Sequence, residues 1–210
     1  MNTLIKYPRT HHLPWSLGVS DDDIRNQGVA QFEDKVVVVT EKMDGENTTM
    51  YHDAMHARSI DSNNHPSRDW VKRFHQDIRW NIPEGWRVCG ENVFAKHSIA
   101  YDDLPSFFLG FSIWDEHNVC LSWNETVEWF ELIGIVPVRT LYYGIFDEKI
   151  IKELPKTLDL TKVEGYVVRN ADSYAYDQFA NNVAKFVRKG HVQTDKHWSQ
   201  EVLQSNRMAF

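Results

Sequence analysis

A lysine flanked by two carboxylates is the residue of this sequence with the clearest chemical potential. Lys42 lies in the segment EKMDG at 41–45, with a carboxylate one residue before it and another two residues after it. A lysine with an ordinary pKa near 10.4 is almost fully protonated at neutral pH, so it becomes a nucleophile only when burial or nearby cations lower its pKa. A bound metal ion and the basic segment around Lys185 are candidates for that role. Taken alone, the same residues also fit a hairpin turn with an exposed lysine.

Further along the chain, other charged residues lie in short strand-like segments. Arg58 is part of ARSID, Glu91 of GEN, Glu164 of VEGYVVR and Lys185 of VAKFVRK. Taken alone, an arginine in a polar strand such as Arg58 is more often a surface charge than a ligand contact. Phe111, in the apolar segment FFLGFSIWD, fits an ordinary core position equally well. These residues indicate one site only when they are taken together and in this order.

The elements that would hold Lys42 are a buried strand, a polar loop and a second strand. Four consecutive valines at 36–39 are too apolar for a half-exposed strand, so they predict a buried one. The polar residues TEKMDGEN at 40–47 then predict a tight loop, and TTMY at 48–51 predicts the second strand. The lysine is therefore expected in a loop between two strands.

The rest of the chain mixes helices and strands without regular βαβ alternation. Ser122 and Glu125 form the S-x-x-E pattern of a capping box, and Gly134 fits the end of the helix that this box opens. This mixture favours an α+β domain built on antiparallel sheets flanked by helices. Other helices are predicted at 66–78, at 147–154 and from about Thr194, and other strands at 86–94, 107–115, 163–169 and 183–189.

Length and composition exclude several classes of protein. With 210 residues, 42% of them hydrophobic, the chain is long enough for one well-buried domain, and nothing marks a boundary inside 1–210. The longest apolar runs fall well short of the ~20 residues of a membrane span, so we expect no membrane partner and a location in the cytoplasm, or in the host cytoplasm for a viral protein. The net charge of −7 limits any contact with nucleic acid to a local surface. Cys89 and Cys120 lack C-x-x-C spacing and are expected to be buried thiols.

In their order, these segments resemble the covalent nucleotidyltransferase superfamily of ligases and capping enzymes, and more closely RNA ligases of the T4 RNA ligase 2 type. The resemblance spans roughly residues 35–198. It implies that Lys42 is the motif I lysine, which attacks the α-phosphate of ATP, expels pyrophosphate and holds AMP through a phosphoramidate bond. Glu41 matches a position that contacts adenine, and Asp44 belongs to the same nucleotide-binding motif.

Three further motifs complete the nucleotide site that the resemblance implies. Arg58 resembles an arginine that lies near the nucleotide phosphate and the RNA end, and Glu91 resembles the motif III glutamate that bonds the ribose hydroxyls. Phe111 is the candidate for the ring that stacks on adenine. Glu164 resembles the motif IV carboxylate that helps to hold the catalytic Mg²⁺, commonly through water, and Mn²⁺ is a possible substitute.

The last motif departs from the family pattern. Lys185 resembles the motif V lysine that contacts phosphate during adenylation, but the usual second lysine is replaced by Val187. Arg188 lies on the opposite strand face unless a bulge intervenes, which leaves its role open. In the segment that follows, His191 and Lys196 join Arg58 and Arg188 as candidate RNA contacts, because cations near a helix N-terminus can bind RNA phosphate.

The resemblance implies an ATP-dependent RNA ligase that works in three steps. Lys42 takes AMP from ATP, AMP passes to an RNA 5′-phosphate, and a 3′-hydroxyl then displaces AMP to form the phosphodiester. Lys42, Lys185 and Glu164 are the expected catalytic residues, with ATP and Mg²⁺ as cofactors and RNA ends as partners. A monomer is expected, and a partner subunit that carries the RNA-binding module stays open.

Two alternatives share the expected fold. After Arg188 few residues remain, too few for the OB-fold of DNA ligases and capping enzymes, so we expect a nucleotidyltransferase domain at 1–210 without an appended OB-fold. A DNA nick ligase or a capping guanylyltransferase is the alternative within the same chemistry. The alternative outside it is a noncatalytic RNA-end-binding protein, which would be expected to lose Lys42 or Glu164.

Overall fold

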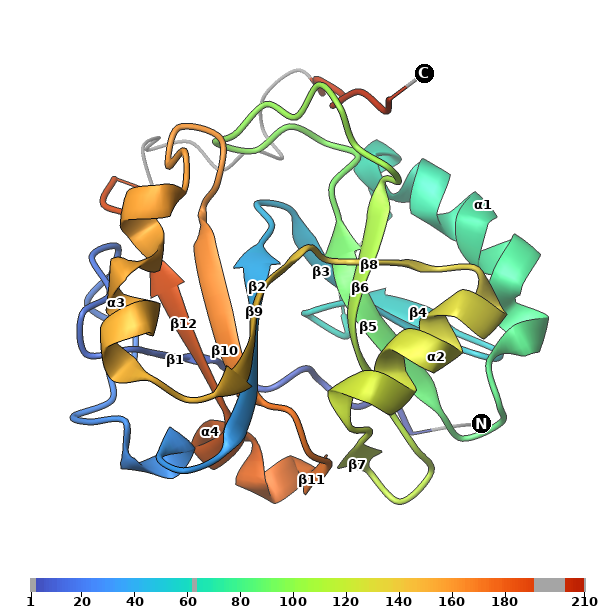
Figure 1. Ribbon diagram of the computed structural model, residues 1–210. Helices are drawn as coiled ribbons and strands as arrows, with labels where there is room; N and C mark the ends of the chain where they lie inside the picture. Colours follow the sequence, from blue (N-terminus) through green and yellow to red (C-terminus); the bar gives the residue numbers. More distant parts are fainter. Residues whose placement is uncertain (1–2, 62–63, 191–202, 210) are drawn as a thin grey trace.

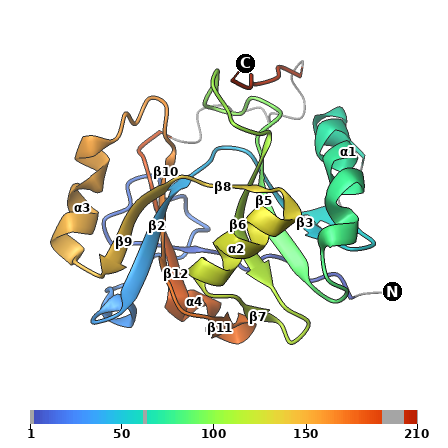
Figure 2. The same cartoon turned by 45° about the vertical axis from the view of Figure 1, so that its right-hand side comes forward.

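Two β-sheets lie side by side in the computed structural model, which describes residues 3–61, 64–190 and 203–209 (Figure 1). Helix α3 (Glu148–Thr157) covers the outer face of the first sheet. Helices α1 (Asp69–Ile78) and α2 (Trp123–Ile133) cover the second sheet, as the turned view in Figure 2 shows. The short helix α4 (Phe179–Asn182) leads into the last strand.

The first sheet has five strands in the order β1-β12-β10-β2-β9. Its neighbours are antiparallel except for β1 and β12, which run parallel. This sheet therefore places strands from the beginning, the middle and the end of the chain next to one another. The bounds are β1 (His11–His12), β2 (Val36–Lys42), β9 (Thr140–Ile145), β10 (Gly165–Asn170) and β12 (Val183–Val187).

The second sheet has seven strands, six of them in the order β11-β7-β6-β5-β3-β4, while β8 pairs with β6. Strands β6 and β8 pair in parallel, and all other strand pairs of the second sheet are antiparallel. The predicted α+β class with antiparallel sheets and flanking helices is confirmed. The bounds are β3 (Glu46–Tyr51), β4 (Met55–Ala57), β5 (Arg87–Asn92), β6 (Phe108–Trp114), β7 (Val119–Cys120), β8 (Val136–Pro137) and β11 (Tyr174–Ala175).

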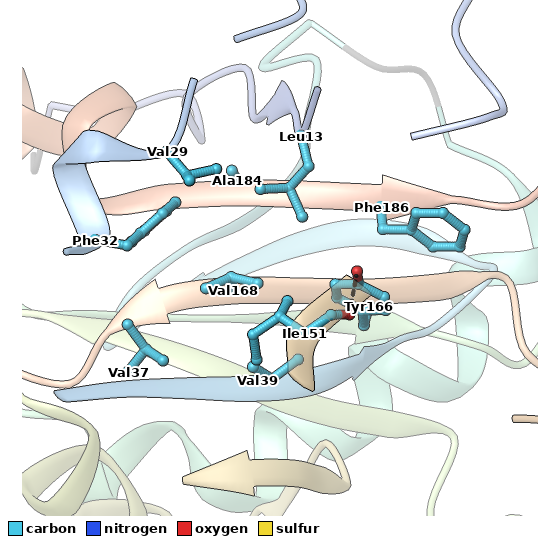
Figure 3. Packing of buried hydrophobic residues seen from close by; sticks show 10 residues of the cluster. All are labelled: Leu13, Val29, Phe32, Val37, Val39, Ile151, Tyr166, Val168, Ala184 and Phe186. Carbon is cyan, nitrogen blue, oxygen red and sulfur yellow. Dashed lines mark hydrogen bonds between the residues drawn. The ribbon is translucent and has the colours of Figure 1, made fainter. Parts of the chain in front are cut away.

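Successive side chains of β2 point to opposite faces of the sheet, so the valines at 36–39 contribute to two hydrophobic cores. Val37 and Val39 point toward α3 and pack with Ile151, whereas Val38 points to the opposite face and packs against residues of the second sheet. In the first of these cores the Tyr166 hydroxyl also donates to the Ile151 carbonyl over 2.9 Å. Figure 3 shows this cluster: Leu13, Val29, Phe32, Val37, Val39, Ile151, Tyr166, Val168, Ala184 and Phe186.

Helix ends follow the sequence closely. The capping box is present, since the Ser122 hydroxyl accepts from the Glu125 amide and the Glu125 carboxylate accepts from the Ser122 amide. Gly134 ends α2 with φ of 88°, a left-handed conformation that favours glycine. Pro66 begins a single 3₁₀ turn rather than the helix itself, so α1 starts three residues later than predicted.

The loop predicted at 40–47 is shorter than expected. Residues 40–42 continue β2, because β10 supplies hydrogen-bonding partners on one side and the chain at Arg139 supplies another on the other side. Only residues 43–45 turn before β3 begins. Lys42 is therefore the last residue of a strand and is held by the sheet. The helix predicted from about Thr194 lies outside the described residues.

An N-terminal segment, residues 5–12, crosses from one sheet to the other. The Ile5 amide donates to the Tyr51 hydroxyl of β3 over 2.8 Å, and the Tyr7 ring packs edge-on against Phe111 of β6, with ring centroids 5.3 Å apart. At its other end the segment forms β1, which pairs with β12. This short strand was not predicted, because two residues carry too little pattern to identify one.

Both cysteines are buried and free, as predicted. Among the described helices, none is long and apolar enough to cross a membrane.

Candidate active site

A pocket of about 510 Å³ opens between the two sheets. Strands β2, β10 and β12 of the first sheet line it, together with β3, β5 and β6 of the second and residues of the N-terminal segment. Six residues predicted for the site meet there, although they come from five separate stretches of the sequence. These are Glu41, Lys42, Arg58, Glu91, Phe111 and Lys185.

Lys42 and Glu164 form an ion pair beside this pocket. The Lys42 Nζ donates to Glu164 Oε2 over 2.7 Å, and the Glu164 side chain is only 1% exposed. Glu164 directly precedes Gly165, which pairs with Lys42 in the sheet. A Cβ at Gly165 would lie 1.9 Å from the Phe186 carbonyl oxygen, so the close approach of β10 to β12 requires glycine there. The strand pairing thus fixes the carboxylate beside the lysine.

Carboxylates control the charge of Lys42. Burial by itself would lower the Lys42 pKa, but the carboxylates of Glu164 and Glu91 outweigh burial and raise the Lys42 pKa. This differs from the expectation that nearby cations lower the pKa of this lysine. In the described arrangement Lys42 is an ammonium ion that must lose a proton before it can act as a nucleophile.

Glu41 is the second acidic side chain of the pocket, and Arg139 holds it. Arg139 Nε donates to Glu41 Oε2 over 2.8 Å, and the Glu41 side chain is 11% exposed. Burial raises the Glu41 pKa, while the Arg139 guanidinium opposes this rise. The sequence did not point to Arg139, because the connection before β9 meets β2 only in the folded chain.

Glu91 is the most strongly perturbed carboxyl group of the pocket. Burial raises the Glu91 pKa to about 8, with Lys42 opposing this shift and Glu164 adding to it. The Glu91 carboxyl group can therefore take up a proton near neutral pH. A protonated carboxyl group can both donate and accept hydrogen bonds, which suits a partner with hydroxyl groups.

Asp44 lies outside the pocket lining. Its Oδ2 accepts from the Ser98 amide over 2.8 Å, from the Ser98 hydroxyl over 2.7 Å and from the Ile99 amide over 2.8 Å. The Asp44 amide in turn donates to the Tyr101 hydroxyl over 2.9 Å. The structure thus gives Asp44 a role in anchoring the chain at 98–101, apart from the nucleotide contact that the sequence suggested.

The pocket has an apolar end, where apolar lining residues group around Phe111. Phe111, Val138 and Val167 line it there. Arg169 also lines the pocket, is 4% exposed, and donates to the Phe111 carbonyl and to the Thr40 hydroxyl. Sequence reasoning missed Arg169, although a signal was present: Val167 and Arg169 are two residues apart on one strand and so share a face.

The cations of the pocket lie around Lys42. Arg58 and Lys185 line the pocket, and Lys185 Nζ is 3.6 Å from Asp23 Oδ1. Arg188 lies one residue beyond the end of β12 and outside the pocket lining, and its amide donates to the Glu164 carbonyl over 2.9 Å. The two other residues expected to bind RNA, His191 and Lys196, lie outside the described residues.

The donor set suits a largely hydrated cation. Among the described residues, no group of three or more His, Cys, Asp and Glu side chains could hold a metal ion. Zinc and calcium sites normally need such a group, whereas Mg²⁺ keeps several waters and binds one or two carboxylates together with substrate phosphates. Glu164, buried beside the pocket, is the carboxylate that fits this pattern.

The fold has counterparts among solved ligases. An archaeal ATP-dependent RNA ligase matches 90% of this chain and 49% of its own, with a TM-score of 0.63 and 16% identity. A putative ATP-dependent DNA ligase from Aquifex aeolicus matches 90% of this chain and 50% of its own, with a TM-score of 0.56 and 21% identity. An alanine variant of Naegleria gruberi RNA ligase, solved with ATP and Mn, matches 78% of this chain and 52% of its own, with a TM-score of 0.53 and 15% identity.

In these comparisons the chain spans about half the length of the solved ligases. No curated protein sequence matches it significantly. The family model described as RNA ligase matches residues 35–187, which is most of the chain and includes every pocket residue predicted from the sequence. The chain therefore belongs to the RNA ligase family of the nucleotidyltransferase superfamily.

Proposed function

We propose that this protein is an ATP-dependent RNA ligase that carries AMP on Lys42. The observation that supports this most directly is the ion pair of Lys42 and Glu164 beside a pocket that apolar side chains and two further cations, Arg58 and Lys185, line. In the first step Lys42 Nζ attacks the α-phosphorus of ATP. A P–N bond forms and the P–O bond to pyrophosphate breaks. The Lys42 nitrogen releases two protons, one from the ammonium ion before the attack and one as the phosphoramidate forms.

Different pocket residues would contact the base, the ribose and the phosphates of ATP. The apolar end, with Phe111 and Val167, would hold the adenine ring, and Glu41 would accept a hydrogen bond from its amino group. Glu91 would bond the ribose hydroxyls. Lys185 and Arg58 would bind phosphate oxygens, where preorganised cations stabilise the charge that develops in the transition state.

The later steps pass AMP to an RNA 5′-phosphate and release it when a 3′-hydroxyl attacks. Glu164 would hold Mg²⁺ or Mn²⁺ through water. When bound, such an ion supplies charge neutralisation at the phosphoryl oxygens. The protein's own residues act in two ways: the Glu164 carboxylate orients Lys42, and Lys185 contacts the phosphates. The proposal that the polynucleotide is RNA rests on the family to which the chain belongs. Joining assays with 5′-phosphorylated RNA and DNA strands of the same sequence would show which of the two is the substrate.

Covalent labelling tests the proposal directly. The protein is incubated with Mg²⁺ and with ATP or GTP labelled at the α-phosphate, or with NAD labelled in its AMP moiety, and is then run on a denaturing gel. We expect label from ATP and little from GTP, because the pocket offers an acceptor to the adenine amino group. We expect none from NAD, because its leaving group is nicotinamide mononucleotide and not the pyrophosphate that Lys185 and Arg58 would bind. Well-folded protein that takes label from none of the three donors would exclude the ligase mechanism and favour an RNA-end-binding protein with the same fold.

Arg139 is expected to control the choice between ATP and GTP. Its guanidinium opposes the rise in the Glu41 pKa that burial causes and so favours the ionised carboxylate, which only accepts hydrogen bonds. In Arg139→Met we expect Glu41 to take up a proton and become a donor, which fits the guanine carbonyl. The ratio of ATP to GTP labelling should fall by roughly 10-fold, the scale of a lost charge-assisted hydrogen bond.

The control for this prediction is Arg73→Met, which removes an exposed arginine of α1. It should leave the ratio of labelling by the two nucleotides unchanged. An unaltered ratio in Arg139→Met as well would show that Glu41 does not read the base.

A further inference from the structure

A chain segment that sequence analysis left without a role reaches Lys185. Strand β1 runs parallel to β12, with His12 opposite Lys185. Residues 20–26 lie against β1 in turn: the His12 amide donates to the Ile24 carbonyl over 2.7 Å, and the Asn26 amide donates to the His12 carbonyl over 2.8 Å. Residues 20–26 thereby bring the Asp23 carboxylate next to Lys185, which lines the pocket.

Asp23 is held in place independently of Lys185. Its Oδ2 accepts from the Ser20 hydroxyl over 2.7 Å and from the Ser20 amide over 3.2 Å. Its Oδ1 lies 3.6 Å from Lys185 Nζ. Burial alone would raise the Asp23 pKa, but the bonds from Ser20 and the charge of Lys185 lower it to about 2. Asp23 is therefore an ionised carboxylate at any working pH.

His12 does not neutralise this carboxylate. Its Nε2 lies 3.3 Å from Asp23 Oδ2, and its Nδ1 is 2.8 Å from the Ser16 hydroxyl. Burial and the nearby Lys185 lower the His12 pKa to about 4, so the imidazole is neutral at neutral pH. Ser16 is 1% exposed and its hydroxyl oxygen accepts from the Val187 amide, which makes it a structural contact rather than a nucleophile. The charge of Asp23 thus acts on Lys185.

Lys185 needs such a partner. Its side chain is 18% exposed, and burial together with the charges of Lys42 and Arg58 opposes its positive charge. Asp23 and Glu164 favour the charged form, but Glu164 is already paired with Lys42. Without Asp23, a half-buried ammonium would face two other cations across the pocket.

We propose that Asp23 is a positioning residue that holds the Lys185 ammonium charged and aimed into the pocket, ready to bind the phosphates of ATP. This inference rests on the proposed adenylation of Lys42. Residues 20–26 are then part of the machinery for the first step, although they lie outside the pocket lining. The separation of 3.6 Å is loose enough for the ammonium to move to a phosphate oxygen without leaving the influence of Asp23.

A double-mutant cycle tests this assignment. The rate of lysyl-AMP formation is measured in a single turnover at saturating ATP for wild type, Asp23→Asn, Lys185→Met and the double variant. We expect Asp23→Asn to slow wild type roughly 10-fold and to slow Lys185→Met less than about 2-fold, because coupled residues in contact are not additive. Asp23→Glu should recover the rate to within about 3-fold.

The matched control is Asp21→Asn, which removes the same charge from an exposed side chain two residues away and should have no effect. If Asp23→Asn slows both backgrounds equally, Asp23 only stabilises the fold and the inference is overturned. Melting temperatures of all variants identify any loss that comes from unfolding. Failure of wild type itself to take up label would instead reject the proposed function, and this inference with it.

Discussion

Lys42→Arg is expected to abolish covalent labelling by ATP, with a loss of at least ~1,000-fold, the scale seen when a catalytic nucleophile is removed. The guanidinium of arginine stays protonated at any working pH and offers no free electron pair to the α-phosphorus. It nevertheless keeps a positive charge next to Glu164. The measurement is the amount of label per mole of protein that stays with the protein on a denaturing gel after incubation with α-labelled ATP.

Lys42→Arg separates loss of the nucleophile from loss of folding better than Lys42→Ala does, because arginine preserves the positive charge of the ion pair. Alanine would remove the ammonium that lies 2.7 Å from a carboxylate with 1% exposure, and an uncompensated buried charge costs roughly 3–5 kcal/mol. A loss of label in Lys42→Ala could then come from unfolding. Unchanged melting of Lys42→Arg would exclude that explanation, and label retained in this variant would place the nucleophile on another residue.

Glu164→Gln should lower the rate of lysyl-AMP formation by at least ~100-fold. Two effects oppose each other in this variant. The Glu164 carboxylate raises the Lys42 pKa, so its removal favours the neutral amine. It also removes the group that orients Lys42 and that would hold the divalent cation, and loss of one preorganised electrostatic group typically costs roughly 10²–10³ in rate. The second effect is larger at neutral pH.

The pH dependence separates these effects. In wild type the ammonium must lose a proton, so the rate should rise with pH across the neutral range. In Glu164→Gln the lower Lys42 pKa should flatten this rise, and high pH or extra Mg²⁺ should not restore the rate. Glu84→Gln, an exposed glutamate, is the control. A variant of Glu164 that regains full activity at high pH would limit Glu164 to setting the pKa of Lys42.

The elements around Lys42 could be predicted because their signals are local. Four valines in a row define the buried strand, and Ser122 with Glu125 defines the start of α2, since each pattern acts within one turn or one strand. The extension of β2 to Lys42 could not be predicted, because it depends on hydrogen bonds to β10, more than a hundred residues away in sequence. Turn residues by themselves favoured a longer loop.

The candidate site was predictable as a set of residue types and much less as a set of contacts. The motif order identified Lys42, Glu91 and Lys185, and the structure brings them to one pocket. The partners of the pocket residues have no local signal: Arg139 contacts Glu41 and Asp23 contacts Lys185 from outside the motifs. Each charge is defined only by what the fold places beside it. Spacing along the chain therefore shows which groups are present but not their protonation states.

The N-terminal segment also has a consequence for how the protein is made. His11 and His12 pair with β12, which is synthesised more than 170 residues after them. Contacts of such long sequence separation form late, because the entropy of closing the intervening loop opposes them. Until β12 emerges, the nascent chain has neither Lys185 nor a strand on which the segment with Asp23 can settle. The pocket is thus completed only after β12 has been synthesised, and a nascent chain that stops before β12 should bind ATP poorly.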